Sequence, residues 1–242
     1  MKSIYTLIIS LSVTFTSLFA QTEISSYGTL NGKVKSIEEK QFYAFANNGG
    51  VEKRSLFYHR NLNFDDKGNE IILKGTNLGN WLVPEGYMFK MEQVNAPRKI
   101  DELLYELVGP DSLQVFWKGF LNNYITHDDI KYLKSIGVNH IRLPFHYKMF
   151  TDDLYMGERN SGFNYFDRLI DWCREEQLYV LLDMHCALGG QTGDNIDDSY
   201  GYPYLLKSKS SQDLMTNIWV SIAERYKNEP VIIGYDIVNE PI

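Results

Sequence analysis

Cysteine is scarce in this 242-residue sequence, which contains only Cys173 and Cys186. An even pair in an exported protein invites a disulfide. However, Cys173 falls late in an expected helix, and Cys186 falls just beyond the strand that follows that helix. A helix and the strand that follows it run in opposite directions, so these two points lie at opposite ends of the pair, too far apart to be bridged. We therefore expect two free thiols.

A basic excess and a second long apolar run are also missing. The net charge is -7 and the isoelectric point is near 5.3, whereas nucleic acid and anionic membranes both require a basic face. The long apolar run lies in residues 1–20, where Lys2 precedes Ile4 to Phe19 and Ala20-Gln21 forms a candidate cleavage point. Serines and threonines interrupt this run, which makes it a poor membrane-spanning helix. We predict a signal peptide, a secreted or periplasmic location, and no membrane or nucleic-acid partner after cleavage.

The sequence also lacks the spacing patterns of metal and nucleotide sites. No set of His, Asp and Glu residues has metal-ligand spacing, and no glycine-rich phosphate loop follows a strand. We therefore expect neither a metal nor a cofactor. Aromatic residues, by contrast, make up 14% of the chain. Most of them are expected to fill a core, although aromatic faces also suit sugar rings.

Strands and helices alternate along most of the chain. Residues 21–60 form an N-terminal extension of unknown role, and the turn residues at 65–69 indicate a β-hairpin that leads to a first buried strand, Ile71 to Gly75. Helical spacing and short apolar runs predict the later elements. The helices are Ile100–Val108, Asp111–Asn122, Asp128–Ile136 (with Thr126 as N-cap and Gly137 as its end), Asn164–Glu176 and Ser211–Tyr226, and the strands are Val138–Pro144, Leu178–Met184 and Val231–Val238. This alternation indicates a parallel sheet of right-handed βαβ units.

A doubly wound sheet and a barrel share this alternation, so the positions of polar residues must decide between them. Each expected strand ends at its carboxyl side in polar residues: Asn77 and Asn80, Arg142, His185, then Asn239 and Glu240. Catalytic groups collected from several strand ends are how a βα-barrel builds its site. The sequence therefore predicts an α/β fold, a (β/α)8 TIM barrel, of which four units are present.

These strand ends resemble the motifs of glycoside hydrolase family five. Asn239-Glu240-Pro241 resembles its fourth-strand motif, while Ile141–Pro144 and Leu182–His185 resemble its second- and third-strand motifs. The segment Asn77–Tyr87 and the loop 187–201 are similar to the exo-β-1,3-glucanase-like branch of the family. The loop departs from the family at one position, where leucine replaces the usual proline. The resemblance implies that residues 61–242 are the first half of a glycoside hydrolase barrel, truncated after the fourth strand.

The resemblance also implies roles for four side chains. Glu240 would be the acid/base, Asn239 would hydrogen-bond the sugar 2-hydroxyl, and Arg142 would hydrogen-bond the nucleophilic carboxylate. His185 would line the subsite at the cleaved bond. Taken alone, Arg142 is also compatible with a structural ion pair, and His185 with a core position. The family's nucleophile comes from the seventh strand, so we expect it to be missing from this chain.

Further residues are candidates for substrate contacts. The resemblance implies that Glu85 and Tyr87 hold the terminal sugar. His146 faces the same rim, and Asp197 and Asp198 are candidates either for sugar hydroxyls or for capping a turn. The implied function is a retaining β-glycosidase that hydrolyses β-1,3- or β-1,4-linked glucan, a polysaccharide or oligosaccharide substrate. Two alternatives stay open: a non-catalytic sugar-binding pseudo-enzyme, and a β-mannanase or glycosylceramide-type glycosidase of the same clan.

Overall fold

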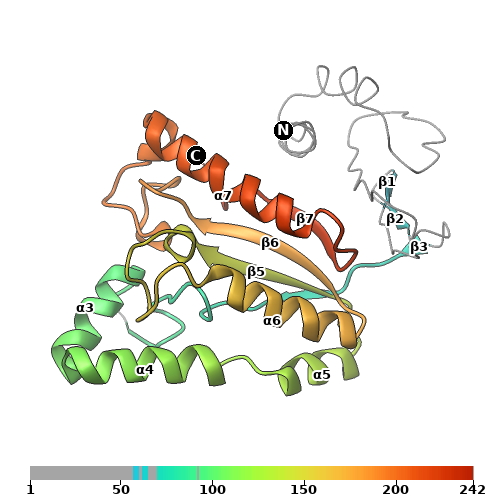
Figure 1. The fold of residues 1–242 in the computed structure, drawn as a ribbon, viewed down its shortest axis with the longest axis horizontal. Helices are drawn as coiled ribbons and strands as arrows, with labels where there is room; N and C mark the ends of the chain where they lie inside the picture. The colour runs from blue at the N-terminus through green and yellow to red at the C-terminus, as the bar shows by residue number, and fades with distance from the viewer. Residues whose placement is uncertain (1–56, 60–61, 65–69, 92, 242) are drawn as a thin grey trace.

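The computed structural model describes residues 57–59, 62–64, 70–91 and 93–241. The expected signal peptide lies outside the described residues, as does nearly all of the 21–60 extension. The described chain opens with a small antiparallel sheet of β1 (Phe57–His59), β2 (Leu62–Phe64) and β3 (Glu70–Ile71), in that order (Figure 1). The predicted N-terminal hairpin is therefore confirmed.

The second sheet is parallel and has four strands. These are β4 (Gly75–Asn77), β5 (His140–His146), β6 (Tyr179–Cys186) and β7 (Ile232–Asp236), and they pair in the order β4-β5-β6-β7. Neighbours in sequence are neighbours in the sheet, and helices connect them. This is the arrangement of consecutive units in a (β/α)8 barrel, which confirms the predicted fold class.

The prediction of a first buried strand from Ile71 to Gly75 was wrong. Ile72 is 66% exposed, and the run belongs neither to one strand nor to the interior of the parallel sheet. Ile71 and Leu73 instead pack against Tyr179 and Ile233, near the beginnings of β6 and β7. The apolar run therefore covers the amino ends of the parallel strands, and the first parallel strand begins only afterwards.

All five predicted helices are present, with bounds shifted by a few residues. They are α3 (Pro97–Val108), α4 (Pro110–Asn123), α5 (His127–Ser135), α6 (Gly162–Glu175) and α7 (Lys209–Tyr226). Short 3-10 turns η1 (Tyr147–Phe150), η2 (Asn195–Asp197) and η3 (Tyr204–Leu206) lie in the loops after β5 and β6. In Figure 1, α4 and α5 lie end to end, and α6 contacts both α5 and β6.

Local sequence explains where α5 begins and ends. The backbone N–H of Thr126 donates to the Asp129 carboxylate at 2.7 Å, as in a capping box. Gly137 follows the helix with φ 89°, and its N–H donates to the Lys134 carbonyl at 3.0 Å. A residue with a Cβ is disfavoured at this φ, so glycine is the natural helix end. The sequence-based assignments of both residues are confirmed.

The two faces of the parallel strands have different environments. Side chains alternate along a strand, and Val180, Leu182 and Met184 of β6 all belong to the main hydrophobic core that packs against the helices. Asp183 and His185 lie on the other face. Trp81 is fully buried in the core, where its indole N–H donates to the Leu121 carbonyl at 3.0 Å. The helix-facing side of the sheet therefore supplies packing, and the opposite side is left for polar groups.

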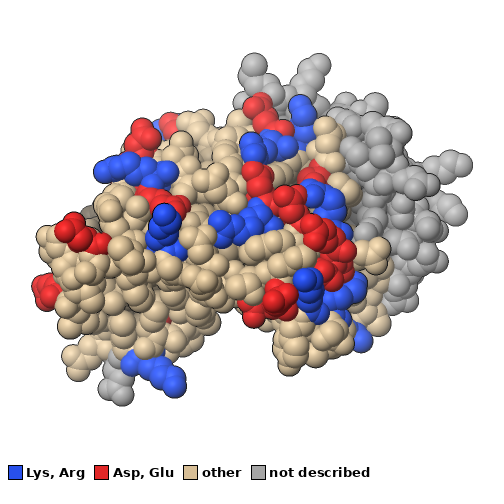
Figure 2. Space-filling model, turned by 60° about the horizontal axis from the view of Figure 1, so that its bottom comes forward, with Lys and Arg blue, Asp and Glu red and all other residues tan. Residues whose placement is uncertain are grey.

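Three further observations concern the expectations on thiols, membranes and charge. Cys173 and Cys186 are both buried and free, as predicted. None of the helices in the described part of the chain combines the length and apolarity that a bilayer crossing requires. On the face shown in Figure 2, basic and acidic side chains are intermixed.

Candidate active site

Arg142 joins the carboxyl ends of three neighbouring strands. Its Nη2 atom lies 2.9 Å from Asp183 Oδ2 in β6 and 3.1 Å from Asp236 Oδ2 in β7. The same nitrogen donates to Asn239 Oδ1, just beyond β7, at 2.8 Å. We call these four residues the Arg142 cluster. Hydrogen bonds between a guanidinium and carboxylates are charge-assisted and geometrically specific, so the cluster fixes the strand ends relative to one another.

The orientation of the Asn239 amide follows from this contact. A guanidinium has only donors, so the amide oxygen must face Arg142 and the amide nitrogen must face away. The backbone holds Asn239 as well, because its N–H donates to the Met184 carbonyl at 3.0 Å and its carbonyl accepts from Gln191 Nε2 at 3.0 Å. Asn239 therefore presents N–H donors from a fixed, buried position.

His185 is fixed by the same aspartate that contacts Arg142. Its Nδ1 lies 2.8 Å from Asp183 Oδ2. An ionised carboxylate only accepts hydrogen bonds, so Nδ1 carries the proton and Nε2 of the neutral ring is an acceptor. Gln191 Nε2 also donates to the His185 carbonyl at 2.7 Å. Gln191 thus ties the loop after β6 to both His185 and Asn239.

Two glutamates lie in the electrostatic field of these groups. Glu240 is exposed and has φ 46°, a left-handed conformation that is strained for a residue other than glycine. Glu85 is half-buried: burial raises its pKa, His185 lowers it whenever the imidazole is protonated, the charge of Glu240 raises it, and that of Arg142 lowers it. Glu85 therefore lies within electrostatic range of Glu240, Arg142 and His185. Asn80 holds the Glu85 backbone, accepting its N–H at 2.9 Å.

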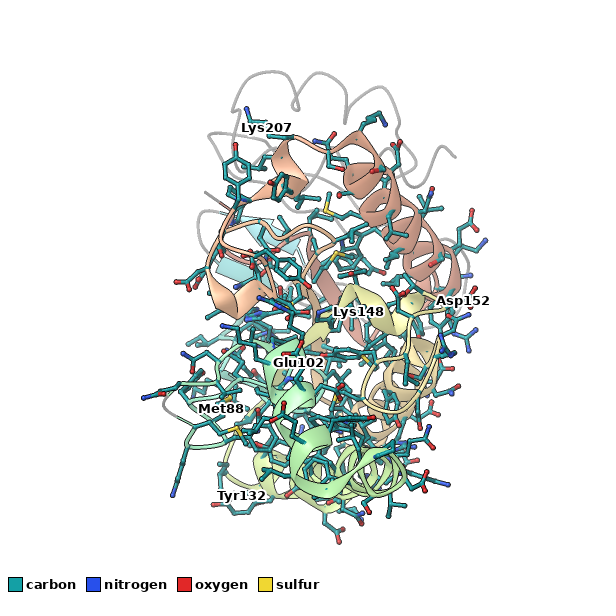
Figure 3. All side chains as sticks on the ribbon, turned by 90° about the vertical axis from the view of Figure 1, so that its left-hand side faces the viewer. Met88, Glu102, Tyr132, Lys148, Asp152 and Lys207 are labelled. Atoms are coloured by element: carbon teal, nitrogen blue, oxygen red, sulfur yellow. The ribbon has the colours of Figure 1, made fainter. Side chains whose placement is uncertain are left out.

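Tyr87 lies at the outer margin of the same segment. Its side chain is 68% exposed. Its pKa is raised by partial burial and by the negative charge of Glu85. Met88, the next residue in the chain, is labelled in Figure 3 and shows where the segment that contains Tyr87 lies. Tyr87 is thus available to a ligand that contacts Glu85.

His146 belongs to a second network. It is fully buried, with its ring stacked against those of Tyr147 and Tyr155 at centroid distances of 4.8 and 4.4 Å. Its Nδ1 accepts the Lys148 backbone N–H at 3.1 Å, so the proton is on Nε2, which lies 3.2 Å from Asp198 Oδ2. Burial lowers the pKa of His146, in agreement with a neutral ring that donates one hydrogen bond and accepts another.

Asp198 is the acceptor at the centre of this network. It accepts the Arg98 backbone N–H at 3.0 Å and Arg98 Nη1 at 3.2 Å, and Lys148 Nζ lies 3.5 Å away. Burial raises the pKa of Asp198, but the hydrogen bond from His146, the Arg98 N–H and the Lys148 charge outweigh it and hold this pKa at about 2. Lys148, just beyond the end of β5, is labelled near the middle of Figure 3. We call Arg98, His146, Lys148 and Asp198 the Asp198 cluster.

Asp197 is likewise engaged by the protein. It is 1% exposed, and its Oδ2 accepts the backbone N–H groups of Gln191 at 2.7 Å and Thr192 at 2.6 Å. Its other oxygen accepts the Ser199 N–H at 2.9 Å. His146, Asp197 and Asp198 are thus bonded to the loop and to α3, and none of the hydrogen bonds and ion pairs described above joins them to the Arg142 cluster.

Sequence reasoning did not single out three residues that build the site: Asp183, Asp236 and Gln191. Asp183 and Asp236 each interrupt an apolar strand, and both lie on the face of Arg142. A carboxylate inside an apolar strand, two residues before a polar strand end, is the signal that identifies Asp183. Gln191 has no comparable signal, because its role depends on the path of its loop.

Comparison with known proteins agrees with the sequence motifs. The family model described as cellulase (glycosyl hydrolase family 5) matches residues 106–242. A β-xylosidase of Phanerodontia chrysosporium is 35% identical over 73% of this chain and 37% of its own length. Endoglucanase C of Acetivibrio thermocellus is 34% identical over 53% of this chain and 36% of its own. A probable glucan 1,3-β-glucosidase A of Aspergillus fumigatus is 29% identical over 79% of this chain and 46% of its own.

Solved structures support the fold. The crystal structure of rutinosidase from Aspergillus niger superposes with a TM-score of 0.58 at 20% identity, covering 69% of this chain and 48% of that one. At this identity the likeness concerns the fold alone. The chain spans less than half the length of the curated relatives it matches. The family model, the β-xylosidase relative and the motifs at the strand ends agree, and the chain belongs to glycosyl hydrolase family 5.

Proposed function

We propose that this chain forms the first four βα units of a retaining β-glycosidase that hydrolyses β-1,3- or β-1,4-linked glucan. The observation that supports this most is the Arg142 cluster. It orients Asn239 directly before Glu240, and it lies in the same electrostatic environment as Glu85. Endoglucanase and glucan 1,3-β-glucosidase relatives support a glucan as substrate.

Charge dictates the chemistry that such a site performs. Hydrolysis with retention needs a carboxylate that attacks the anomeric carbon and a carboxylic acid that protonates the leaving oxygen, about 5–5.5 Å apart. Glu240 gives its proton to the glycosidic oxygen as the C–O bond breaks and the nucleophile bonds the anomeric carbon. Glu240 then takes a proton from the water that attacks the glycosyl-enzyme. The family resemblance assigns the nucleophile to a seventh strand, beyond the four-stranded sheet described above, with Arg142 stabilising its charge.

The remaining groups bind the sugar. The amide N–H groups of Asn239 face away from Arg142 and donate to the 2-hydroxyl, a contact that strengthens in the transition state. Glu85, whose backbone Asn80 holds, and the exposed Tyr87 bind the terminal sugar. For Asp197 and Asp198 the arrangement favours the alternative role of loop stabilisation, and we assign His146 to the same structural network.

We also propose that residues 1–20 direct export, so that the enzyme meets its polysaccharide outside the cytoplasm. A polymeric substrate outside the cell fits this assignment. N-terminal sequencing of the mature protein, with a start at or near Gln21, is the measurement that checks it.

Glu240→Gln in the protein with a complete barrel tests the function. General acid help contributes about 10²–10⁴-fold, so hydrolysis of β-1,3- and β-1,4-glucan is expected to fall by that factor. Hydrolysis of an aryl β-glucoside with a good leaving group, which needs little protonation, is expected to fall much less in its glycosylation step. Glu224→Gln, an exposed change on α7, is the matched control and keeps full activity.

The alternatives give different results. Full activity of Glu240→Gln on unactivated glucan would remove the acid/base assignment. Binding of glucan without turnover by the unmutated complete protein would favour the sugar-binding pseudo-enzyme. Faster turnover of β-mannan than of glucan would favour the mannanase alternative.

A further inference from the structure

We propose that Asp183 is the positioning residue of this site, and that one of its oxygens fixes both the Arg142 guanidinium and the acceptor face of His185. This inference rests on the proposed glycosidase function. It adds a residue that touches no substrate and acts through His185, which lines the subsite at the cleaved bond, and through Arg142, which stabilises the nucleophile.

The geometry centres on a single atom. Asp183 Oδ2 lies 2.9 Å from Arg142 Nη2 and 2.8 Å from His185 Nδ1. Asp183 itself is fully buried in the middle of the sheet, opposite Pro144 of β5 and Asp236 of β7. The Asp183 carboxylate couples these two side chains, because the oxygen that accepts the hydrogen bond from His185 also forms the ion pair with Arg142.

Stability does not explain a carboxylate at this position. Burying a charge is costly unless it is fully paired, and a well-packed apolar residue is often as stable as a buried ion pair. Asp183 is not fully paired, since its second oxygen, Oδ1, is buried without a hydrogen-bond partner. Burial raises the pKa of Asp183, against the lowering effects of the His185 hydrogen bond and the Arg142 charge. The site, rather than the fold, accounts for this residue.

The hydrogen bond between Asp183 and His185 determines which groups of the site donate hydrogen bonds and which accept them. With Nδ1–H directed at Asp183, His185 offers Nε2 as an acceptor, while Asn239 offers N–H donors. A sugar hydroxyl both donates and accepts, so this pair of groups selects the direction of each hydroxyl hydrogen bond. Loss of Asp183 frees the imidazole to rotate or to change tautomer, and a displacement of about 1 Å costs on the order of 10²-fold in rate.

Two substitutions separate charge from shape. Asp183→Ala removes the hydrogen-bond acceptor of His185 and the ion-pair partner of Arg142, and is expected to lower kcat/KM on glucan by about 10²-fold. Asp183→Asn keeps an acceptor oxygen for His185, removes the charge that faces Arg142, places its amide nitrogen where Oδ1 lacks a partner, and is expected to lose less. Where the alanine variant does not fold, the asparagine variant decides the outcome.

A double-mutant cycle separates positioning from a merely structural role. The cost of Asp183→Asn in kcat/KM is measured in the unmutated protein and in a His185→Ala background. Action through His185 predicts a markedly smaller cost in the second case. A structural role predicts equal costs, together with a fall in thermal stability. Asp167→Asn is the control, because it breaks the pair with Arg225 on the outer helices and is expected to change stability without changing kcat/KM.

Aryl β-glucosides that each lack one hydroxyl provide the second readout. The unmutated enzyme is expected to discriminate against the analogue without the hydroxyl that faces His185. Asp183→Ala and His185→Ala are expected to lose this discrimination, and Asp183→Asn, whose neutral oxygen is a weaker acceptor, is expected to lose part of it. Unchanged kcat/KM and discrimination in Asp183→Asn would overturn the inference, as would equal costs in the cycle. If Glu240→Gln nevertheless abolishes glucan hydrolysis, the proposed function stands without it.

Discussion

Replacement of Asp198 by asparagine tests whether the Asp198 cluster is structural. The aspartate side chain is 6% exposed, accepts hydrogen bonds from groups on α3 and at the end of β5, and forms an ion pair with Lys148 on η1. All of its neighbours in the cluster are donors or cations. An asparagine amide has one oxygen and one NH2 group, so at least one donor would face another donor in the variant.

The magnitude follows from two terms. The pKa of Asp198 is about 2 in the folded protein against a reference of 3.8, and at about 1.36 kcal/mol per unit the ionised form contributes about 2 kcal/mol of stability. A buried donor left without a partner costs about 1–3 kcal/mol more. We expect Asp198→Asn to lower the free energy of unfolding at pH 7 by about 3–5 kcal/mol, the range found when one partner of a buried ion pair is removed.

The sign of the pH dependence is fixed by the direction of the shift. A folded-state pKa below the unfolded value contributes stability that is complete above the reference pKa of 3.8 and is lost as the pH falls towards about 2. Between these values the unmutated protein is expected to lose about 2 kcal/mol more than the variant.

Urea unfolding monitored by tryptophan fluorescence, at pH 7 and through the acid range, measures both effects. Asp213→Asn is the control, because its pair with Lys209 is an exposed i,i+4 contact worth less than about 0.5 kcal/mol. An Asp198→Asn variant with unchanged stability and unchanged acid dependence would refute the reasoning. If the KM of the variant for glucan rose at the same time, Asp198 would again be assigned to the residues that contact the substrate.

Two further predictions concern the thiols and a helix end. Both thiols are expected to resist alkylation in the native protein and to react after unfolding, because Cys173 and Cys186 are buried and burial raises the pKa of Cys173 to about 12. Mass spectrometry checks this. A mass increase after alkylation of the native protein, or the mass of a disulfide-bonded chain, would contradict it. Gly137→Ala is expected to destabilise the protein by about 1–2 kcal/mol, because φ at this residue is 89°. Nothing lies near the added Cβ, so the cost comes from the backbone conformation and not from a steric clash. An unchanged melting temperature would show that the backbone relaxes.

The sequence predicted the elements whose hydrophobic pattern and boundary residues agree. Helices α6 and α7 have apolar residues at helical spacing, and β6 and β7 are apolar runs of strand length. The first parallel strand escaped prediction because Gly75-Thr76-Asn77 has no apolar pattern, while the apolar residues before it cover the amino ends of other strands. The position of this strand depends on packing between residues that are far apart in the sequence, and no local sequence pattern indicates such packing.

The candidate site was predictable as far as topology determines it. Parallel strands place their carboxyl ends at one edge, so Arg142, His185 and Asn239 were expected to lie together, and the structure joins Arg142 to Asn239 directly and to His185 through Asp183. Their catalytic roles stay predictions. Loop residues were less predictable, because the environment of Asp198 depends on partners up to 100 residues away in sequence.

The most direct test of the central claim, that Glu240 is the acid/base of a retaining glycosidase, is chemical rescue of Glu240→Ala. Azide needs no general base, so it can attack a glycosyl-enzyme that the variant forms from an activated aryl β-glucoside but hydrolyses slowly. We predict that azide accelerates turnover by the variant and not by the unmutated enzyme, and that the product is the β-glucosyl azide. A variant that hydrolyses unactivated glucan at the unmutated rate, or that gives no glycosyl azide while still turning over the aryl glucoside, would contradict the account.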